Sequence, residues 1–234
     1  MHKVYYAPWE PGGSYHIYNR AVSLNRLFTS RRDVYKFREK LRRKLLPFFE
    51  IYALGCVGNH FHLHGRVRSL AQIRAYLHAQ PSLLRRQQRF LDGELGFQEF
   101  MGDVFARTFN AYAKAFNQFH GRTGTLFNQT VRRLRVRNDL LSRRLIAYIH
   151  CNEIKHGISD MVMGLGHKTT FYELCNQRSR LCAVDLVLER FGGRDAFIAY
   201  HRAYKSKRLN ALRRFDESRA FGYATPRARP AWAA

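Results

Sequence analysis

The stretch Cys56-Val57-Gly58-Asn59-His60-Phe61-His62-Leu63-His64 decides the interpretation of this chain. Gly58-Asn59 favours a tight turn, which predicts an antiparallel hairpin of two strands over 49–57 and 60–67. Successive side chains of a strand point to opposite faces, so His60 and His62 share a face and Phe61 lies on the other. Two imidazoles on a rigid element are a natural start for a divalent metal site. Alone, such a pair is more often structural than metal-binding.

The rest of the chain mixes strand and helix patterns. A first strand is predicted over 14–22, and a short basic strand over 134–137. Helices are predicted from Thr29 or Ser30 to Pro47, over 69–91 with an interruption at Pro81, and over 103–120, 138–157, 183–191 and 195–209. The sum is an α+β fold with a small antiparallel sheet, flanking helices and a helical C-terminal piece.

Two further patterns concern the core. The helix predicted over 103–120 carries an aromatic stripe at helical spacing, which we interpret as core: Phe105, Phe109, Tyr112, Phe116 and Phe119. The four cysteines, at 56, 151, 175 and 182, have no C-x-x-C spacing. Buried reduced thiols are therefore expected rather than a zinc site or a disulfide framework.

Composition points to a polyanionic partner. The 234 residues include 41 lysines and arginines against 17 acidic residues, a formal charge of +24. An imbalance of this size favours nucleic acid before an anionic membrane. No apolar run approaches the ~20 residues that span a bilayer, and the first residues lack the apolar core of a signal peptide. We expect a cytoplasmic protein, associated with the nucleoid through DNA, and no membrane partner.

The second chemistry-bearing segment lies about ninety residues downstream. Tyr148 and Asn152 are four residues apart, which places them on one face of the helix predicted over 138–157. If this face packs beside His60 and His62, two imidazoles and one amide oxygen can hold a metal beside a phenol. A phenol, with a pKa of about 10, leaves phosphorus more easily than a sugar alcohol does. The arrangement therefore suits reversible phosphoryl transfer to an enzyme tyrosine.

The segments Asn59-His60-Phe61-His62-Leu63 and 148–157 (YIHCNEIKHG) resemble the two motifs of the single-tyrosine HUH transposases. The second is most similar to REP-associated tyrosine transposases, whose usual pattern there is Y-I-H-x-N-P-V-K-x-G. Similar stretches also occur at 15–20, 112–117 and 121–127, and at 191–193 with Phe197 and His201 in a C-terminal extension found in some members. The resemblance covers residues 14–205.

The resemblance implies that Tyr148 attacks single-stranded DNA and keeps a covalent 5′-phosphotyrosine link. It implies that His60, His62 and Asn152 bind a divalent metal, and imidazole with amide ligation is compatible with Mg²⁺ or Mn²⁺. The implied fold is that of an HUH endonuclease, with a ferredoxin/RRM-like core of antiparallel sheet and helices. The implied substrates are hairpin-forming single strands of REP elements. The resemblance leaves the choice between monomer and homodimer open.

Three units follow from these observations: a catalytic domain over 1–163, a helical extension over 164–210 and a basic, flexible tail over 211–234. Basic side chains before the helix with Tyr148 are predicted to contact DNA phosphates. The candidate DNA-binding residues are Arg20, Arg122, Arg132, Arg133, Arg135 and Arg137.

The sequence departs from the family pattern at three places. Glu153 replaces the usual proline, His64 replaces an aliphatic residue, and 128–131 (NQTV) replaces a Q-x-R-F stretch. None removes an implied catalytic group, and we expect His64 not to be a ligand because Asn152 fills the third position. Two alternatives stay open: a non-cutting DNA or RNA hairpin-binding regulator derived from a transposase, and a hydrolytic nuclease that uses metal-bound water.

Overall fold

Four strands form one antiparallel sheet in the order β2-β3-β1-β4. The structure, a computed structural model, describes residues 6–23, 25–128, 131–152 and 167–212, with side chains up to residue 205. The strands are β1 (Ser14–Arg20), β2 (Phe49–Val57), β3 (His60–Val67) and β4 (Arg132–Val136). The predicted α+β class with a small antiparallel sheet and flanking helices is confirmed, and the hairpin of β2 and β3 has the predicted bounds.

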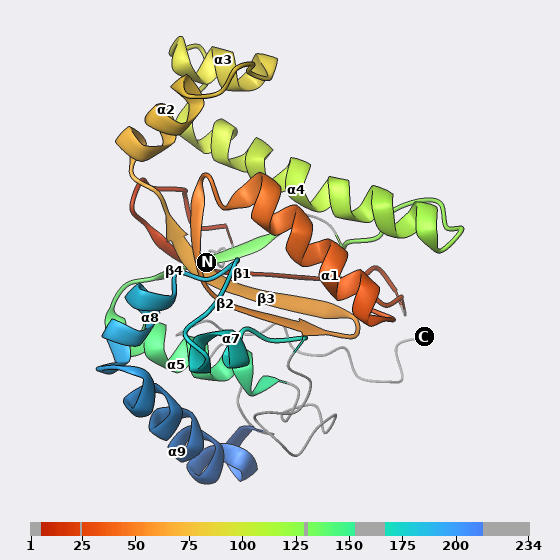
Figure 1. Cartoon of the computed structure of the whole chain (residues 1–234). Coiled ribbons are helices and arrows are strands. Elements are labelled where there is room, and N and C mark those ends of the chain that lie inside the picture. The colour runs from red at the N-terminus through yellow and green to blue at the C-terminus, as the bar shows by residue number, and fades with distance from the viewer. Residues whose placement is uncertain (1–5, 24, 129–130, 153–166, 213–234) are drawn as a thin grey trace, which may run out of the picture.

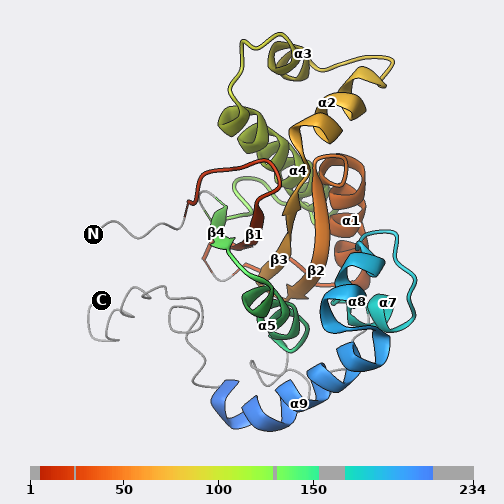
Figure 2. The same cartoon turned by 90° about the vertical axis from the view of Figure 1, so that its left-hand side faces the viewer.

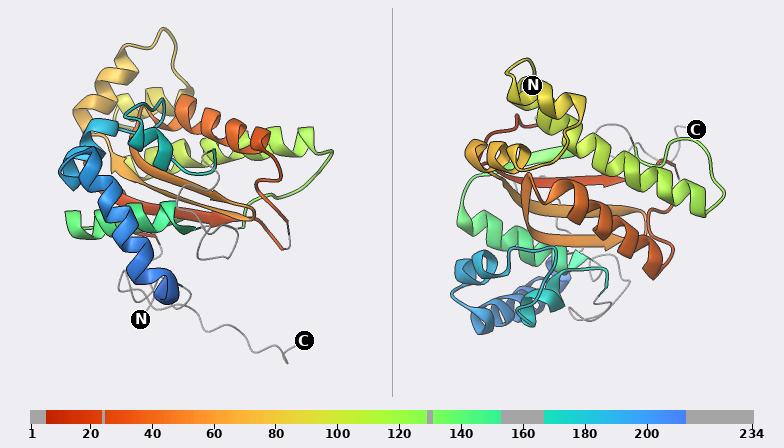
Figure 3. Two further views of the ribbon diagram at one scale, coloured as in Figure 1. Left: turned by 60° about the horizontal axis from the view of Figure 1, so that its bottom comes forward. Right: turned by 45° about the horizontal axis from the view of Figure 1, so that its top comes forward.

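Helices cover both faces of this sheet (Figure 1, Figure 3). On one face lie α1 (Arg31–Lys40), its π-helical continuation η1 (Leu41–Leu45) and α4 (Phe97–Phe119). Phe61 of β3 packs on this side, with its ring centroid 5.0 Å from that of Phe37 in α1 and 5.1 Å from that of Phe109 in α4. The opposite face is covered by α5 (Asp139–His150). The alternation of β3 therefore sends Phe61 toward α1 and α4, and its histidines toward α5.

The chain from 167 through α7 (Phe171–Cys175), which was not predicted, to α8 (Val184–Phe191) covers the outer edge of β2. The last helix, α9 (Arg194–Leu212), packs on α5, α7 and α8. Isolated bridges join Gly55 to Thr169 and Ile51 to Cys182, and the amide of Ala183 donates to the carbonyl of Ile51 at 2.9 Å. These contacts occupy edge groups that would otherwise be open to pairing with another chain. Two further helices, α2 (Leu70–His78) and α3 (Arg85–Leu91), project beyond the sheet near the start of α4 (Figure 2).

Several helix ends differ from the predictions. Helix α4 begins at Phe97, six residues before the predicted start, because Phe100 and Met101 extend its buried face toward the N-terminus. The last member of the aromatic stripe, Phe119, is 52% exposed, and the guanidinium of Arg32 lies 3.3 Å from its ring centroid. Phe119 is therefore a surface residue, and its assignment to the core was wrong.

Helix α5 ends earlier than predicted. Its last residue is His150, and Cys151 is the C-cap with φ −93° and ψ 6°. Asn152 therefore follows the helix end instead of continuing the same helical face, and the remainder of the predicted helix, 153–157, lies outside the described residues. The start agrees with the prediction: Asn138 caps the helix by accepting from the amide of Leu141 at 2.8 Å.

One hydrophobic cluster runs through the described parts of the chain and includes Phe171 and Phe197 of the C-terminal helices. All four cysteines are buried thiols, as predicted, and burial raises the pKa of Cys151 to about 12 and that of Cys182 to about 11. Within the described segments, no helix is both long and apolar enough to cross a membrane. The predicted tail over 211–234 lies outside the described residues except for the last two residues of α9.

Candidate active site

The face of the sheet under α5 carries a cluster of histidines and a tyrosine. His60, His62 and His64 alternate along β3 and therefore share this face. Antiparallel register places Tyr18 of β1 directly opposite His62, and His16 directly opposite His64. Directly opposed residues lie on the same face of a sheet. The cluster thus contains side chains from two adjacent strands, and the sequence analysis had identified only those of β3.

His60 lies at the start of β3, where the turn fixes its orientation. The Nδ1 of His60 is 2.8 Å from Oδ1 of Asn59. Since that oxygen can only accept, Nδ1 carries the proton and Nε2 keeps its lone pair. The Nε2 of His60 faces Asn152, whose Nδ2 lies 3.2 Å away. The structure therefore brings Asn152 to the histidine pair, although it lies beyond the end of α5.

The loop before α1 holds the turn in place. The amides of Leu27 and Phe28 both donate to the carbonyl of Gly58, at 2.8 and 3.0 Å, and the amide of Ala21 donates to the carbonyl of Asn59 at 2.8 Å. These three hydrogen bonds fix the backbone of the turn, so the first residue of β3 has little conformational freedom. His60 is thus positioned by backbone contacts on both sides.

His62 is 3% exposed and contacts His16, which the sequence analysis did not identify. The Nδ1 of His62 is 2.9 Å from Nε2 of His16, and their ring centroids are 5.1 Å apart. A hydrogen bond at Nδ1 leaves Nε2 as the nitrogen through which a metal would bind. The signal for His16 was present in the sequence, because alternation in 14–20 places it on the same face as Tyr18.

Tyr148 lies over this cluster on the underside of α5. Its ring centroid is 5.4 Å from that of His62 and 6.4 Å from that of His16, and both ring pairs are edge-on. The side chain is only 1% exposed. Tyr18 approaches from the sheet, with its ring centroid 5.7 Å from that of His62. Two tyrosines therefore flank the histidines, one buried in α5 and one partly buried in β1.

A glycine in β2 allows α5 to come this close. Gly55 lies directly opposite His62 in the register. A Cβ added at Gly55 would lie 2.8 Å from the carbonyl oxygen of Ile149 and 3.0 Å from its Cγ2. Contacts of 2.8 Å to backbone force a shift, so only glycine permits this approach. The absence of a side chain at Gly55 therefore determines how closely α5, and with it Tyr148, approaches the histidines of β3.

His64 has a different environment from its neighbours on β3. It is fully buried, with Nδ1 at 2.9 Å from the carbonyl oxygen of Tyr15 and Nε2 at 2.7 Å from Oγ of Ser142 in α5. The carbonyl requires a proton on Nδ1, so the Ser142 hydroxyl donates to Nε2 and accepts from Nη1 of Arg190 at 2.9 Å. Burial lowers the pKa of His64 to about 4. Both nitrogens are used in structural hydrogen bonds.

His150, at the end of α5, is part of a second buried network. Its Nδ1 lies 3.0 Å from Nε2 of His201 in α9, and its Nε2 lies 3.0 Å from Oγ1 of Thr170. His201 in turn directs Nδ1 to the carbonyl oxygen of Phe197 at 2.8 Å. Burial lowers the pKa of His150 well below its ordinary value and that of His201 to about 4. Neutral imidazoles therefore join the C-terminal helices to the helix that carries Tyr148.

The predicted DNA-binding arginines divide between the two faces of the sheet. Arg20 is exposed and lies directly opposite His60, and Arg132 is exposed and lies directly opposite Tyr18, so both flank the histidine cluster. Arg137 is exposed just before the N-cap of α5.

The remaining candidates have structural partners. The Nε of Arg133 donates to the carbonyl of Ala7 at 2.6 Å, and burial lowers its pKa. Arg135 pairs with Glu10 at 2.8 Å and donates to the hydroxyl of Tyr15 at 3.0 Å. Arg122 donates from Nη1 to Oδ1 of Asn117 at 3.3 Å. Alternation along β4 places Arg133 and Arg135 on the face away from α5.

One buried polar atom bears on metal binding. Asn152 is only 1% exposed, and its Oδ1 has no hydrogen-bond partner among the residues that the structure describes. It is Nδ2 of this amide that faces His60, and the opposite amide orientation would turn the oxygen toward the histidines, where a bound cation would satisfy it. The described residues contain no group of three or more His, Cys, Asp or Glu side chains that could hold a metal. A set of two histidines and one amide oxygen, His60, His62 and Asn152, is not such a group. It suits a divalent cation whose remaining coordination positions are open to water or phosphate.

Comparison with known proteins gives one solved structure of similar fold. It is described as a REP-associated tyrosine transposase bound to a REP hairpin, and the similarity covers 76% of this chain and 86% of that one, with a TM-score of 0.48 and 16% sequence identity. No family model and no curated protein sequence matches the chain.

Proposed function

We propose that this protein is a metal-dependent transposase or endonuclease of single-stranded, hairpin-forming DNA, which cleaves and rejoins strands through a 5′-phosphotyrosine at Tyr148. The observation that carries the proposal is the convergence of His60, His62 and Asn152 under Tyr148, with Oδ1 of Asn152 buried and unsatisfied. Residues far apart in the chain meet at one point beside the sheet, and a phenol next to groups that can bind a divalent cation suits phosphoryl transfer to a tyrosine.

The chemistry assigned to Tyr148 is an exchange of ester bonds. The phenolic oxygen attacks the scissile phosphorus and forms a P–O bond, the bond from phosphorus to the 3′-oxygen of the preceding nucleotide breaks, and the phenolic proton is released as that oxygen becomes a hydroxyl. Attack by a 3′-hydroxyl in the reverse direction restores the phosphodiester. No bond energy is lost to water, so rejoining needs no separate energy source.

The proposed metal ligands are Nε2 of His60, Nε2 of His62 and Oδ1 of Asn152, with an exchange of the amide orientation of Asn152 so that its oxygen faces the cation. A bound Mg²⁺ or Mn²⁺ supplies Lewis-acid polarisation of the scissile phosphate. His16 holds the ring of His62 through Nδ1, as outer-shell partners of ligating histidines do. Arg20 and Arg132 then flank the site as phosphate contacts on the same face.

One observation favours the non-cutting regulator. Tyr148 is 1% exposed, so a DNA phosphate can reach its hydroxyl only after the side chain or its surroundings move. A regulator that binds hairpins without cutting has no requirement for an accessible phenol. The proposed enzyme does require one, and product analysis separates the two.

The test is incubation of the full chain with a single-stranded hairpin oligonucleotide labelled at its 3′ end, with Mn²⁺ or with EDTA. The proposed enzyme gives a labelled protein band that survives boiling in detergent and is absent with EDTA. A hydrolytic nuclease gives a free 5′-phosphate and no such band, and a non-cutting regulator leaves the oligonucleotide intact. Either of these results overturns the proposal.

A further inference from the structure

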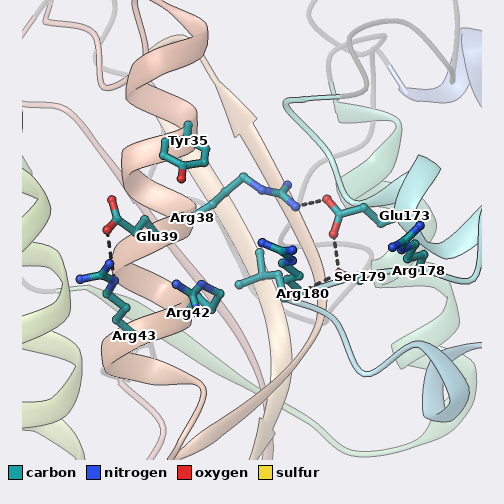
Figure 4. Close-up of a pocket in the computed structure, with 10 residues that line it drawn as sticks. Tyr35, Arg38, Glu39, Arg42, Arg43, Glu173, Arg178, Ser179 and Arg180 are labelled. Atoms are coloured by element: carbon teal, nitrogen blue, oxygen red, sulfur yellow. Dashed lines mark hydrogen bonds and ion pairs between the residues drawn. The ribbon is translucent and has the colours of Figure 1, made fainter.

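A groove lined by arginines lies between α1 and the C-terminal segment that covers the β2 edge (Figure 4). It encloses about 550 Å³. One wall is the second half of α1 with η1, and the other is the chain from α7 to α8. The lining residues are Tyr35, Arg38, Glu39, Arg42, Arg43, Glu173, Arg178, Ser179, Arg180 and Leu181. None of them was among the predicted site residues.

The charges of the groove are not balanced. Its two carboxylates are already engaged: Glu173 pairs with Arg38, and Glu39 lies 3.1 Å from both Arg43 and Lys36. Arg42, Arg178 and Arg180 are exposed and form no ion pair with any described residue. Three fixed positive charges around one hollow attract an anion, because their mutual repulsion is relieved when one binds.

Each wall of the groove contains a stretch with an uncommon backbone conformation. After α1 the chain continues as the π-helical turn Leu41–Leu45, closed by a hydrogen bond of 3.1 Å from the amide of Leu46 to the carbonyl of Leu41. This turn carries Arg42, and single π-helical turns are frequent at functional sites. On the other wall Gln177 has φ 52°, in the left-handed region that non-glycine residues rarely adopt.

The second wall is also held rigidly. Glu173 accepts from the Ser179 hydroxyl, and Oγ of Ser179 accepts from the amides of Leu181 and Cys182, at 3.0 and 2.8 Å. These bonds fix the turn between Arg178 and Arg180, and the bridge of Cys182 to Ile51 attaches it to the sheet. The two arginines are therefore presented on a preorganised loop, which reduces the ordering cost of binding.

We propose that this groove binds the phosphate backbone of single-stranded nucleic acid, with an unpaired base stacked on Tyr35. Tyr35 is 66% exposed and lines the groove beside the arginines, with the Lys36 ammonium 5.9 Å from its ring centroid, so one hollow offers cations for phosphate and an exposed aromatic ring for a base. An acidic protein segment would use the cations but not the exposed ring. This proposal rests on the proposed function: the groove binds a part of the substrate strand that is distant from the scissile phosphate.

The test is equilibrium binding of a fluorescent ~20-nucleotide single strand that forms no hairpin, in EDTA, over a series of salt concentrations. For Arg178→Gln/Arg180→Gln we expect roughly tenfold weaker binding, and a log–log salt slope shallower by about 1.4, because each single-strand phosphate contact contributes about 0.7. For Tyr35→Ala we expect about fivefold weaker binding with an unchanged slope, because stacking releases no counterions. EDTA removes any contribution from cleavage, so a failure here is distinct from a failure to form the covalent adduct.

The matched control is Arg74→Gln/Arg85→Gln, which removes two exposed arginines on α2 and α3 and keeps the same net charge as the groove variant. Weaker binding in the groove variant alone supports the proposal, whereas equal weakening in the control shows a general charge effect and overturns it. A blunt duplex that loses as much affinity as the single strand overturns the assignment to single strands. A groove variant that keeps its DNA affinity but no longer binds poly-glutamate assigns the groove to an acidic protein and also overturns the proposal.

Discussion

Two groups of histidines lie around α5 and differ in their surroundings: His64 of β3 with His150 of α5 and His201 of α9, and the pair His60 and His62 of β3. His64, His150 and His201 are buried, and each ring nitrogen has a partner in a protein carbonyl, hydroxyl or imidazole. Nδ1 of His60 contacts Asn59 and its Nε2 contacts the amide of Asn152, whereas Nδ1 of His62 contacts His16 and its ring lies edge-on to that of Tyr148. The first group joins the sheet and helices to one another, and the second lies beside Asn152 and Tyr148, where we propose the active site.

The contacts of each histidine distinguish a structural role from a proposed role in metal binding, which residue type alone does not. His62 and His64 are two residues apart on one strand, so sequence proximity and sheet face are the same for both. What differs is the partner across the interface: His64 meets Ser142 of α5, whereas His62 meets the ring of Tyr148. The fully buried, neutral His64 joins β3 to α5 and contributes to stability, and we propose metal binding for His60 and His62.

The largest expected effect is the loss of activity in His60→Ala. The side chain is only partly buried, so its removal should leave the fold intact while it removes a proposed metal ligand. We expect the rate of adduct formation to fall by about 100-fold. Thermal unfolding measured in parallel should hardly change. His78→Ala, at an exposed position at the end of α2, is the matched control and should keep the wild-type rate.

The second prediction concerns stability, measured by urea unfolding at neutral pH. His64→Ala removes the acceptor of the Ser142 hydroxyl and the imidazole donor to the Tyr15 carbonyl, and it opens a cavity, so the free energy of unfolding should fall by about 3 kcal/mol. The folded fraction should keep its affinity for Mn²⁺. Loss of Mn²⁺ binding with unchanged stability would instead make His64 a ligand and erase the distinction between the two groups.

The third prediction is a pH dependence of stability from His201. Its pKa is about 4 in the folded protein and about 6.5 in an unfolded chain, so between these values the unfolded state binds more protons. Stability contributed by this residue is full above pH ~6.5 and is lost as the pH falls toward 4, by about 3 kcal/mol in all. Urea midpoints across this range should fall less steeply in His201→Gln. An identical pH profile in the variant contradicts a buried neutral His201.

The smallest expected effect tests the contact between α5 and β2. In Gly55→Ala the new Cβ would lie 2.8 Å from the carbonyl oxygen of Ile149, so α5 must move outward. We expect a loss of about 1–2 kcal/mol in the free energy of unfolding and a several-fold slower adduct rate. Gly102→Ala is the control, because nothing lies within 4 Å of its Cβ position inside α4, and it should stabilise the protein slightly. Equal effects in the two variants would show that Gly55 does not position the helix.

Much of the fold could be predicted from short-range sequence patterns. The Gly58-Asn59 turn, the alternation in 60–67 and the capping residues Ser30 and Asn138 each depend on neighbours in sequence, and all agree with the structure. Helix α7 was missed because it is only five residues long and its burial depends on the C-terminal helices. Phe119 was placed in the core because helical spacing cannot show where a helix extends past the sheet.

The candidate site was only partly predictable. Motif resemblance identified His60, His62, Tyr148 and Asn152, and the structure brings them together. His16 and Tyr18 were missed because strand pairing, which no local pattern gives, places them beside His62. The partners of His64 and His150 were likewise unpredictable, since they come from contacts across 78 and 51 residues.

The most direct test of the central claim is to locate the DNA attachment by mass spectrometry of the trypsin-digested adduct. Digestion places the two tyrosines near His62 in different peptides. Tyr148 lies in the peptide 145–155 and Tyr18 lies in the peptide 4–20. We predict a nucleotide remnant on Tyr148 in the wild type and no adduct in Tyr148→Phe. A remnant on Tyr18, or an adduct that persists in Tyr148→Phe, would contradict the assignment of Tyr148 as the nucleophile.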